Sequence, residues 1–350
     1  TPLDTLREGT VMARKRGKTS PVEGLMPAPA ATDPEREVQP AFSFPKFFQM
    51  LGLVALIFGA EFLVARLPNR VELGPRRSEL RFERVRLPAA ALAPLELVGA
   101  WKMESPDRRF GGLSGLAIDR GRILAISDSG VLAWFPKPGT ASPSVYMREL
   151  PTGPRGNWYR WNRDTEALTL DPGGRGWWVA YEHGNELWLY DPEFRHGLRR
   201  VELGYRRWPA NLGIEGIVPS GRDLLLFLEE GRKIFRVHGA RSTAMPVKGK
   251  EARFSEAVRL PGGRLLAIER RLSNTGFENR LVALKETSRG FQVLRGRALP
   301  VGRLDNVEGM TAERLPNGRT RLWLVTDDNF QRPLRTLLLA IDLPPGGEAI

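Results

Sequence analysis

The chain has 350 residues, with 53 Lys and Arg against 40 Asp and Glu, which gives a net charge of +13. It contains no cysteine, so disulfide bonds and thiolate metal sites are excluded. The basic residues are scattered and accompany no zinc-finger, helix-turn-helix or RNA-binding signature, so no nucleic-acid partner is expected.

The first part of the chain differs in composition from the rest. Residues 1–46 are rich in proline, alanine and charge without an apolar period, which predicts a disordered tail. Residues 47–65 then contain a single charge, Glu61. As a helix of 1.5 Å rise they would span about 28 Å, close to the apolar thickness of a bilayer. The alternative is a buried helix of the following domain, but the segment lies outside the repeats described below.

These features predict four regions: a tail over 1–46, a membrane-anchor or signal helix over 47–66, a linker over 67–79, and one domain over 80–350. The arginines that follow the apolar segment favour a cytoplasmic domain by the positive-inside tendency. Because signal-anchors commonly carry large domains across the membrane, we nevertheless expect a membrane-anchored or exported protein with its domain on the extracytoplasmic, periplasmic side. The oligomeric state is not predicted.

From residue 80 the chain is built of short apolar runs, and one phrase recurs five times. Its central residues, 52, 49, 41 and 52 positions apart, are Ser114, Glu166, Glu215, Glu256 and Glu308. A period of 40–50 residues with strand-like content is typical of a β-propeller. Each phrase is followed by a turn rich in Gly, Asp and Asn and then by an almost wholly apolar strand, as expected when both faces are buried.

Two N-terminal runs, 80–87 and 95–103, have no repeat of their own. One of them is expected to pair with the last repeat, since joining the chain ends closes the ring and removes exposed edges. The predicted fold is therefore all-β: a single propeller of five to six blades, preceded by the disordered tail and the hydrophobic helix.

Acidic residues recur at a second position, where the apolar second strand of each repeat ends. A hairpin brings this end back beside the start of the first strand, so two rings of acids should share one end of the propeller. The inner ring would hold Glu166, Glu215, Glu256 and Glu308, and the second Asp128, Glu182, Glu230, Glu269 and Asp327. Like charges so close need a cation or a proton between them.

Several arrangements would satisfy these acids. Ca²⁺ takes six to eight oxygen ligands and suits the inventory, neighbouring arginines could pair with the carboxylates, or some acids could stay protonated and serve acid–base chemistry. In a fourth arrangement each glutamate accepts backbone N–H bonds from the next blade and is a scaffold residue. We predict Ca²⁺ ligands at Glu166, Glu215, Glu256, Glu308 and Asp327.

Further residues near these motifs have chemistry suited to an anionic ester. Glu182, His183 and Asp128 are predicted to handle protons, and Arg163, Arg270, Arg332 and Asn329 to bind substrate oxygens. No Gly-x-Ser-x-Gly elbow or Ser-His-Asp set is evident.

The succession GGLSGLAID…ILAISD, DTEALTLD…WWVAYE, GIEGI…LLLFLEE, FSEAV…LLAIERR and NVEGM…LWLVTDDN resembles the bacterial esterase-like phytase family over about residues 85–345. The resemblance implies a β-propeller, by analogy with phytases that bind Ca²⁺ through acidic channel residues, and hydrolysis of phosphate or other esters. Ser114 departs from the pattern, so the inner ring of glutamates is broken at the first repeat.

The leading functional prediction is a Ca²⁺-dependent ester or phosphoester hydrolase acting on a small anionic ester at the acidic end of the channel. Two alternatives stay open: a non-catalytic, membrane-tethered propeller that serves as a binding platform, and a lactonase-type propeller.

Overall fold

The computed structural model describes residues 74–151, 153, 163–182, 184–203, 213–249 and 253–344. All of them belong to one compact unit, Phe48–Ile350. The predicted tail, the predicted anchor over 47–65, part of the linker and His183 lie outside these residues. In the described part of the chain, no helix combines the length and the apolar character that a membrane crossing needs.

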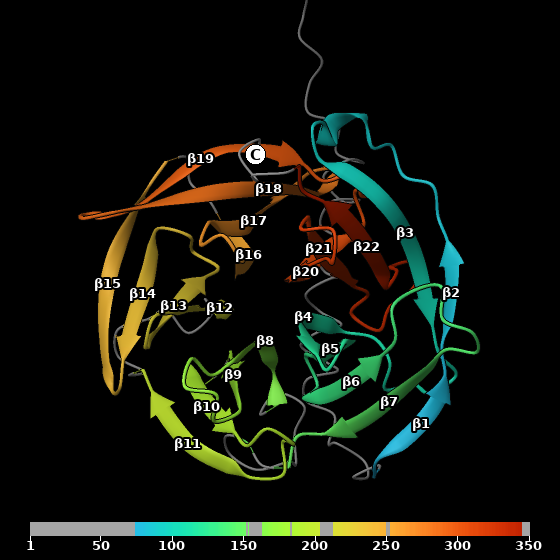
Figure 1. Ribbon diagram of the computed structural model, residues 1–350, viewed down its shortest axis with the longest axis horizontal. Coiled ribbons are helices and arrows are strands. Elements are labelled where there is room, and N and C mark those ends of the chain that lie inside the picture. Colours follow the sequence, from blue (N-terminus) through green and yellow to red (C-terminus); the bar gives the residue numbers. More distant parts are fainter. Residues whose placement is uncertain are drawn as a thin grey trace, which may run out of the picture. The chain divides into compact units, whose positions relative to one another are not determined.

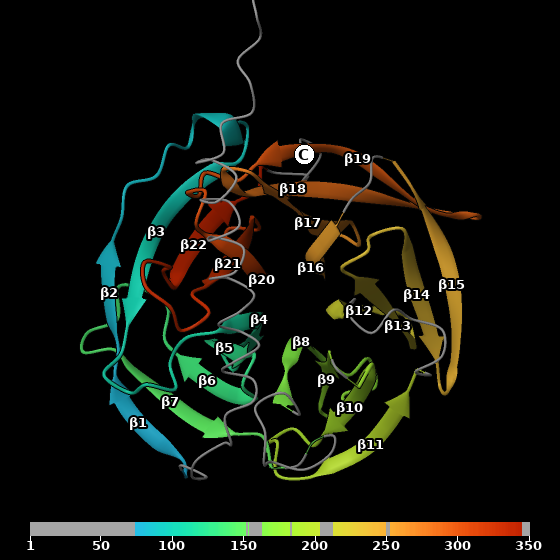
Figure 2. The same cartoon turned by 180° about the vertical axis from the view of Figure 1, so that it is seen from behind.

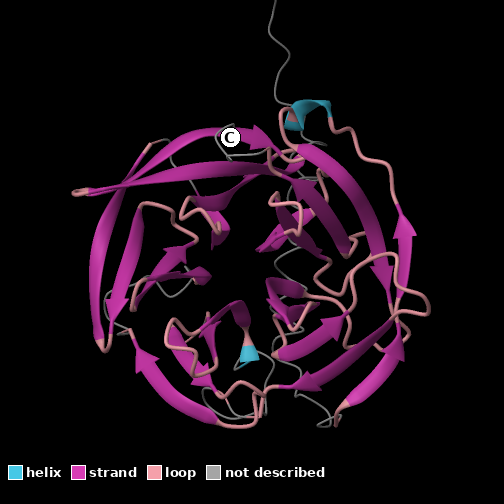
Figure 3. Cartoon of the chain, viewed as in Figure 1, coloured by secondary structure: helices cyan, strands magenta, loops and turns pink. Residues whose placement is uncertain are grey.

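The described residues form strands and turns, with the 3-10 helix η1 (Ala90–Leu92) near the start and no α-helix among them (Figure 3). The phrase that recurs in the sequence forms the innermost strand of each repeat. These five strands contact one another in turn and return to the first, which closes a ring seen from both sides in Figures 1 and 2. They are β4 (Leu113–Asp119), β8 (Thr165–Leu170), β12 (Ile214–Ser220), β16 (Arg253–Arg259) and β20 (Asn306–Arg314).

Outward from each inner strand runs an antiparallel sheet. The first repeat has the order β1-β7-β6-β5-β4 and the second β11-β10-β9-β8. The strands added here are β1 (Arg76–Glu79), β5 (Arg122–Ser127), β6 (Val131–Phe135), β7 (Ser144–Glu149), β9 (Trp177–Tyr181), β10 (Glu186–Tyr190) and β11 (Gly197–Glu202).

The third and fourth repeats share an eight-stranded sheet of order β12-β13-β14-β15-β19-β18-β17-β16. Its halves are joined at the outer edge by a short parallel pairing of β15 with β19, Val247 to Phe291 and Lys248 to Gln292. The strands added here are β13 (Asp223–Leu228), β14 (Lys233–His238), β15 (Arg241–Lys248), β17 (Leu265–Ser273), β18 (Gly276–Thr287) and β19 (Gly290–Ala298).

The last sheet joins the two ends of the described chain. Its order is β2-β3-β22-β21-β20, with β2 (Arg81–Arg84), β3 (Glu96–Glu104), β21 (Thr320–Asp327) and β22 (Leu337–Asp342). Strand β3 pairs with β22 from Leu337–Lys102 to Asp342–Glu96. The prediction that an N-terminal run pairs with the last repeat is therefore confirmed, and the closing sheet draws strands from both ends of the fold.

The core lies between neighbouring sheets rather than at the centre of the ring. Five apolar clusters occupy these spaces. In β13, for example, Leu226 packs toward the second repeat and Phe227 toward the fourth, both fully buried. Because alternate side chains of a strand point to opposite faces, a strand held between two clusters must be apolar throughout. The all-β prediction is confirmed, and the radial sheets give a β-propeller-like fold.

Candidate functional site

A β-bulge at the same point of every inner strand determines which side chain the repeat presents. In each repeat the pairing with the second strand skips one residue, which stands unpaired. The skipped residues are Ser114, Glu166, Glu215, Ser255 and Glu308. Four of the five predicted centres therefore occupy equivalent positions, whereas in the fourth repeat Ser255 takes the place expected for Glu256.

Glu256 differs from its prediction in both register and environment. It pairs with Ile268, the position that Gly or Ala fills in the other repeats. The side chain is 3% exposed, and its Oε1 accepts the N–H of Ala257 at 2.8 Å. Burial raises the pKa of Glu256, while backbone N–H bonds from Ala257 and Met310 lower it. Since Met310 lies on β20, Glu256 is a backbone acceptor linking two inner strands, the scaffold role that the sequence left open.

The second predicted ring also changes at the third and fourth repeats. The backbone N–H groups of Asp128, Glu182 and Glu229 donate to carbonyl oxygens two residues before each bulge, at 2.8, 3.0 and 3.3 Å. By strand pairing, the equivalent residues in the fourth and fifth repeats are Arg270 and Asp327. Glu229 therefore replaces the predicted Glu230, and an arginine stands where Glu269 was expected.

Arg270 places a cation among the acids. Its side chain is 13% exposed, and its Nη1 donates to Glu308 and, at 2.9 Å, to Asn306. Its Nη2 lies 3.5 Å from Glu229 and 3.8 Å from Glu215. Burial lowers the pKa of Arg270, but the carboxylates of Glu308, Glu215 and Glu229 outweigh burial and raise it. In the structure Arg270 thus contacts carboxylates of the third and fifth repeats, and its predicted contact with substrate stays a prediction.

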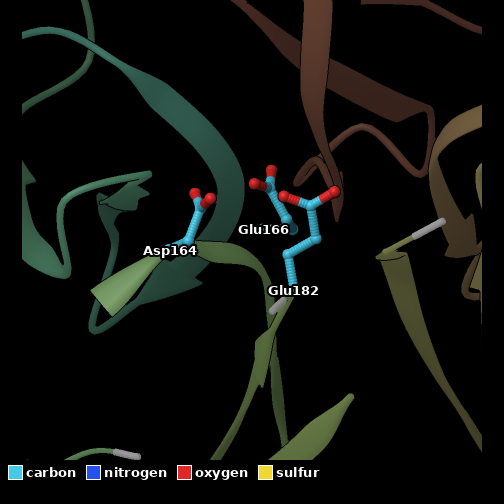
Figure 4. A group of neighbouring side chains, drawn as sticks. All are labelled: Asp164, Glu166 and Glu182. Carbon is cyan, nitrogen blue, oxygen red and sulfur yellow. The ribbon is translucent and has the colours of Figure 1, made fainter. Parts of the chain in front are cut away.

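Three carboxylates from the second repeat converge on one point (Figure 4). One oxygen from each of Asp164, Glu166 and Glu182 lies within 4.8 Å of the others. Glu182 reaches this point because Gly213 leaves room for it: a Cβ on Gly213 would lie 2.4 Å from Glu182 Cγ. Asp164 was missed in the sequence, although it stands in the Asp-Thr-Glu form of the recurring phrase.

The pKa values in this group are raised by burial and by mutual repulsion. Burial comes first for Glu166, and the carboxylates of Asp164, Glu215 and Glu182 raise its pKa further. Burial likewise raises the pKa of Glu182, and Asp164 adds both repulsion and a shared side-chain hydrogen bond. For Glu215, burial raises the pKa and Arg270 lowers it, while Glu229 adds to the increase. The acids of separate repeats therefore interact across the ring, as the sequence predicted.

A second acidic group lies between the first and fifth repeats. Asp327 is 3% exposed, and its Oδ1 accepts the N–H of Asn329 at 2.7 Å. Burial raises the pKa of Asp327, and the carboxylates of Glu308 and Asp128 raise it further. Asp128 packs against Gly112, whose φ of 57° suits glycine and on which a Cβ would lie 2.6 Å from Asp128 Oδ1. We call the whole set the acid cluster: Asp128, Asp164, Glu166, Glu182, Glu215, Glu229, Glu308 and Asp327.

The remaining predicted substrate residues lie in differing surroundings. Asn329 has a left-handed φ of 45°, an uncommon conformation that often marks functional loops. Arg332 is exposed and adds a minor contribution to the lowered pKa of Glu104, which is due chiefly to Lys102. Arg163 is 1% exposed and donates to the carbonyl of Leu150, so the structure places it in the interior rather than at a surface that a substrate could reach.

Of the eight acids in the acid cluster, Glu215 and Asp327 are buried and the others are half-buried, and Arg270 is the cation that stands among them in the described part of the chain. Oxygen ligands of this kind and number suit a hard divalent cation such as Ca²⁺. The convergence of Asp164, Glu166 and Glu182, each able to turn an oxygen toward the same point, fits such an ion better than the originally predicted set, because Glu256 is engaged by the backbone.

Residues 108–330 match a protein family described as "Phytase-like: Esterase-like activity of phytase". No curated protein sequence matches the chain.

Among solved structures, the chain is similar to the glutaminyl cyclase of Myxococcus xanthus, with 12% identity over 71% of this chain and 96% of that one and a TM-score of 0.45. It is also similar to a catalytically inactive virginiamycin B lyase from Staphylococcus aureus with quinupristin, with 10% identity over 76% and 100% of the two chains and a TM-score of 0.42. Likenesses this distant carry no argument about chemistry.

Proposed function

We propose, from the premise that this chain belongs to the phytase-like family described by the esterase-like activity of phytase, that it hydrolyses ester bonds at the acid cluster. The observation that supports this most directly is the convergence of Asp164, Glu166 and Glu182 within 4.8 Å. Half-buried carboxylates at such distances repel one another, and folding tolerates them where a bound group or a proton compensates.

The same residues are our proposed Ca²⁺ ligands, with Glu215 next to them. Bound there, the ion would neutralise an anionic ester and polarise the group under attack. Compared with the sequence prediction, Asp164 and Glu182 join the ligand set. Glu256 leaves it because its carboxylate accepts backbone N–H groups, and Glu308 leaves it because Arg270 binds it. Asp327 also leaves the set and takes the role described next. Arg270 contacts Glu215 of the third repeat and Glu308 of the fifth, which keeps the acids of different repeats at fixed separations.

Asp327 is our candidate proton donor, with Asp128 beside it. Burial and the neighbouring carboxylates raise the pKa of Asp327, so it retains its proton nearer to neutral pH than an exposed aspartate does. A leaving alkoxide needs such a group for protonation. Asn329, bound through its N–H to Asp327, lies on the loop that would meet the substrate.

We also propose a five-bladed architecture. The eight-stranded sheet counts as two blades, because only a short parallel pairing joins its halves and an apolar cluster lies between them. A membrane anchor over 47–65, export of the domain and a small anionic ester as substrate complete the proposal.

The test is turnover of p-nitrophenyl phosphate, p-nitrophenyl acetate and a simple lactone, each with EDTA and with added Ca²⁺. We expect hydrolysis of an ester that EDTA abolishes and Ca²⁺ restores. Replacing Glu166 by Gln should lower the rate by at least about 100-fold, whereas Glu230→Gln should leave it unchanged, because Glu230 adjoins the cluster without belonging to it.

Activity that persists in EDTA would refute the role of the metal. Turnover of the lactone alone would favour the lactonase-type alternative, and no turnover of any substrate with Ca²⁺ present would favour the non-catalytic platform.

A further inference from the structure

A cavity of about 310 Å³ lies between the first and second repeats, away from the acid cluster. The cavity borders the start of β5 at Arg122, whereas the cluster begins beyond its end at Asp128. At 3.3 Å per residue, the two backbone positions are about 20 Å apart along the strand. The cavity is lined chiefly by Arg77, Arg120, Arg122, Arg148, Arg195, Asp119, Glu193, Trp134 and Tyr146.

The arginines of this cavity outnumber its acids, and their charges are largely uncompensated. Arg120 forms ion pairs with both carboxylates of the cavity, at 3.8 Å from Asp119 and 3.4 Å from Glu193. Within the described part of the chain, the other four have no carboxylate at salt-bridge distance. Two are instead held by backbone carbonyls: Arg122 donates to Trp134 at 2.8 Å and Arg148 to Glu193 at 2.5 Å.

Two further observations describe arginines of this cavity whose polar groups are incompletely compensated. The Nε of Arg148 is buried without a hydrogen-bond partner among the described residues. The pKa of Arg122 is lowered, first by burial and then by the charge of Arg77, with Asp119 opposing. Guanidinium groups that repel one another at a cavity wall would each be stabilised by an anion placed between them.

The cavity also has an aromatic wall. Trp134 is held by its Nε1–H, which donates to Asp119 at 2.8 Å, and by an edge contact with Phe194 at 5.8 Å. Tyr146 lies 5.8 Å from Trp134, and the guanidinium of Arg77 stands over the Tyr146 ring. A ligand that reaches these arginines therefore meets flat apolar surface as well as positive charge.

We propose that this cavity binds a small organic phosphate with a flat, preferably aromatic, group. Its volume is at the lower end for small-molecule sites. Planar guanidinium groups match phosphate oxygens with paired N–H donors, and the two rings offer a surface on which an aromatic group can stack. The site is independent of the proposed hydrolysis, since it shares no residue with the acid cluster.

The test is titration calorimetry of the full-length protein in EDTA, which keeps metal out of the acid cluster, with phenylphosphonate, inorganic phosphate and benzoate. Phenylphosphonate has no ester bond, so hydrolysis cannot confuse the readout. We expect it to bind more tightly than either other ligand, and to bind about tenfold more weakly to Arg77→Gln/Arg122→Gln. The matched control, Arg241→Gln/Arg289→Gln, removes the same charge from exposed positions elsewhere and should change Kd by less than about twofold.

An equal loss in the two double variants would overturn the proposal, because it would show a general effect of net charge. Absence of phenylphosphonate binding at millimolar concentration would also overturn it, and equal affinity for phosphate would overturn the aromatic part. If the double variant does not fold, Arg195→Gln, at an exposed position, should still weaken binding about threefold.

Discussion

Arg270 is the residue whose replacement tests the acid cluster most directly. We predict that Arg270→Met lowers the free energy of unfolding by about 3–5 kcal/mol at pH 7.5 in EDTA, the range found when one partner of a buried charge network is removed. Methionine keeps most of the length and removes the charge. Glu308, Glu215 and Glu229 would then lie close together with no cation between them.

The magnitude follows from the distances. Arg270 lies 3.5 Å from Glu229 and 3.8 Å from Glu215. At an effective dielectric constant of 20, opposite charges at these distances attract by about 4–5 kcal/mol for each pair. Burying a side chain that is only 13% exposed offsets several kcal/mol of this attraction. The net loss of a few kcal/mol is what the variant should show.

The loss should also depend on pH. Burial already raises the folded-state pKa of Glu215, and without Arg270, which lowers it, that pKa rises further. Stability from such groups is fully present below the unfolded pKa and is lost as pH rises through the folded pKa. The difference between variant and wild type should therefore shrink as pH falls from 8 toward 5.

Urea denaturation followed by tryptophan fluorescence at several pH values measures this difference. The matched control is Arg280→Met, because Arg280 is 46% exposed and lies 3.8 Å from Glu269; we expect a loss of no more than about 1 kcal/mol. Wild-type stability in Arg270→Met at pH 7.5, or a loss that is the same at pH 5 and pH 8, would refute the reasoning.

Three further predictions concern the same site. Burial raises the pKa of Glu166, Glu182 and Glu215, so the metal-free protein should gain stability as pH falls from 8 to about 5.5, by up to about 1.4 kcal/mol per pH unit for each group. Ca²⁺ should raise the melting temperature at pH 8 more than at pH 5.5. A stability of the metal-free protein that falls as pH falls over this range would contradict the prediction. Glu256→Ala should cost about 2–3 kcal/mol in urea denaturation, since two backbone donors lose their acceptor, with Ca²⁺ affinity by calorimetry unchanged; a loss of affinity would return Glu256 to the ligand set. Gly213→Ala should weaken Ca²⁺ binding about tenfold by displacing Glu182, whereas Gly262→Ala, with nothing within 4 Å of the added Cβ, should have no effect.

Much of the site's general location is readable from the sequence. The repeat spacing, the apolar second strands and the acids at strand ends predict inner strands whose carboxylates meet at one end of the ring. Asp128, Glu166, Glu182, Glu215, Glu308 and Asp327 are found there. These inferences succeed because a hairpin returns the chain to its starting edge whatever its side chains are, so local pattern suffices.

The fourth repeat shows what local pattern cannot decide. In the sequence, the glutamate of Phe-Ser-Glu aligns with the central glutamates of the other repeats. In the structure, Phe254 is fully buried against Phe227, with ring centroids 5.4 Å apart. That packing sets the register of β16, so Ser255 takes the bulge and Arg270 the acid position of β17.

The sequence by itself therefore determined the class of fold, the succession of inner strand, turn and second strand within each repeat, and the end of the ring at which acids gather. Only the tertiary structure decided that an arginine stands among those acids and that Glu256 accepts backbone N–H groups instead of joining the cluster. It also decided that arginines far apart in the sequence line a separate cavity. The physical reason is that a shift of one residue in a strand moves a side chain to the other face, and the packing between neighbouring sheets, not the neighbouring residues in the chain, selects the shift.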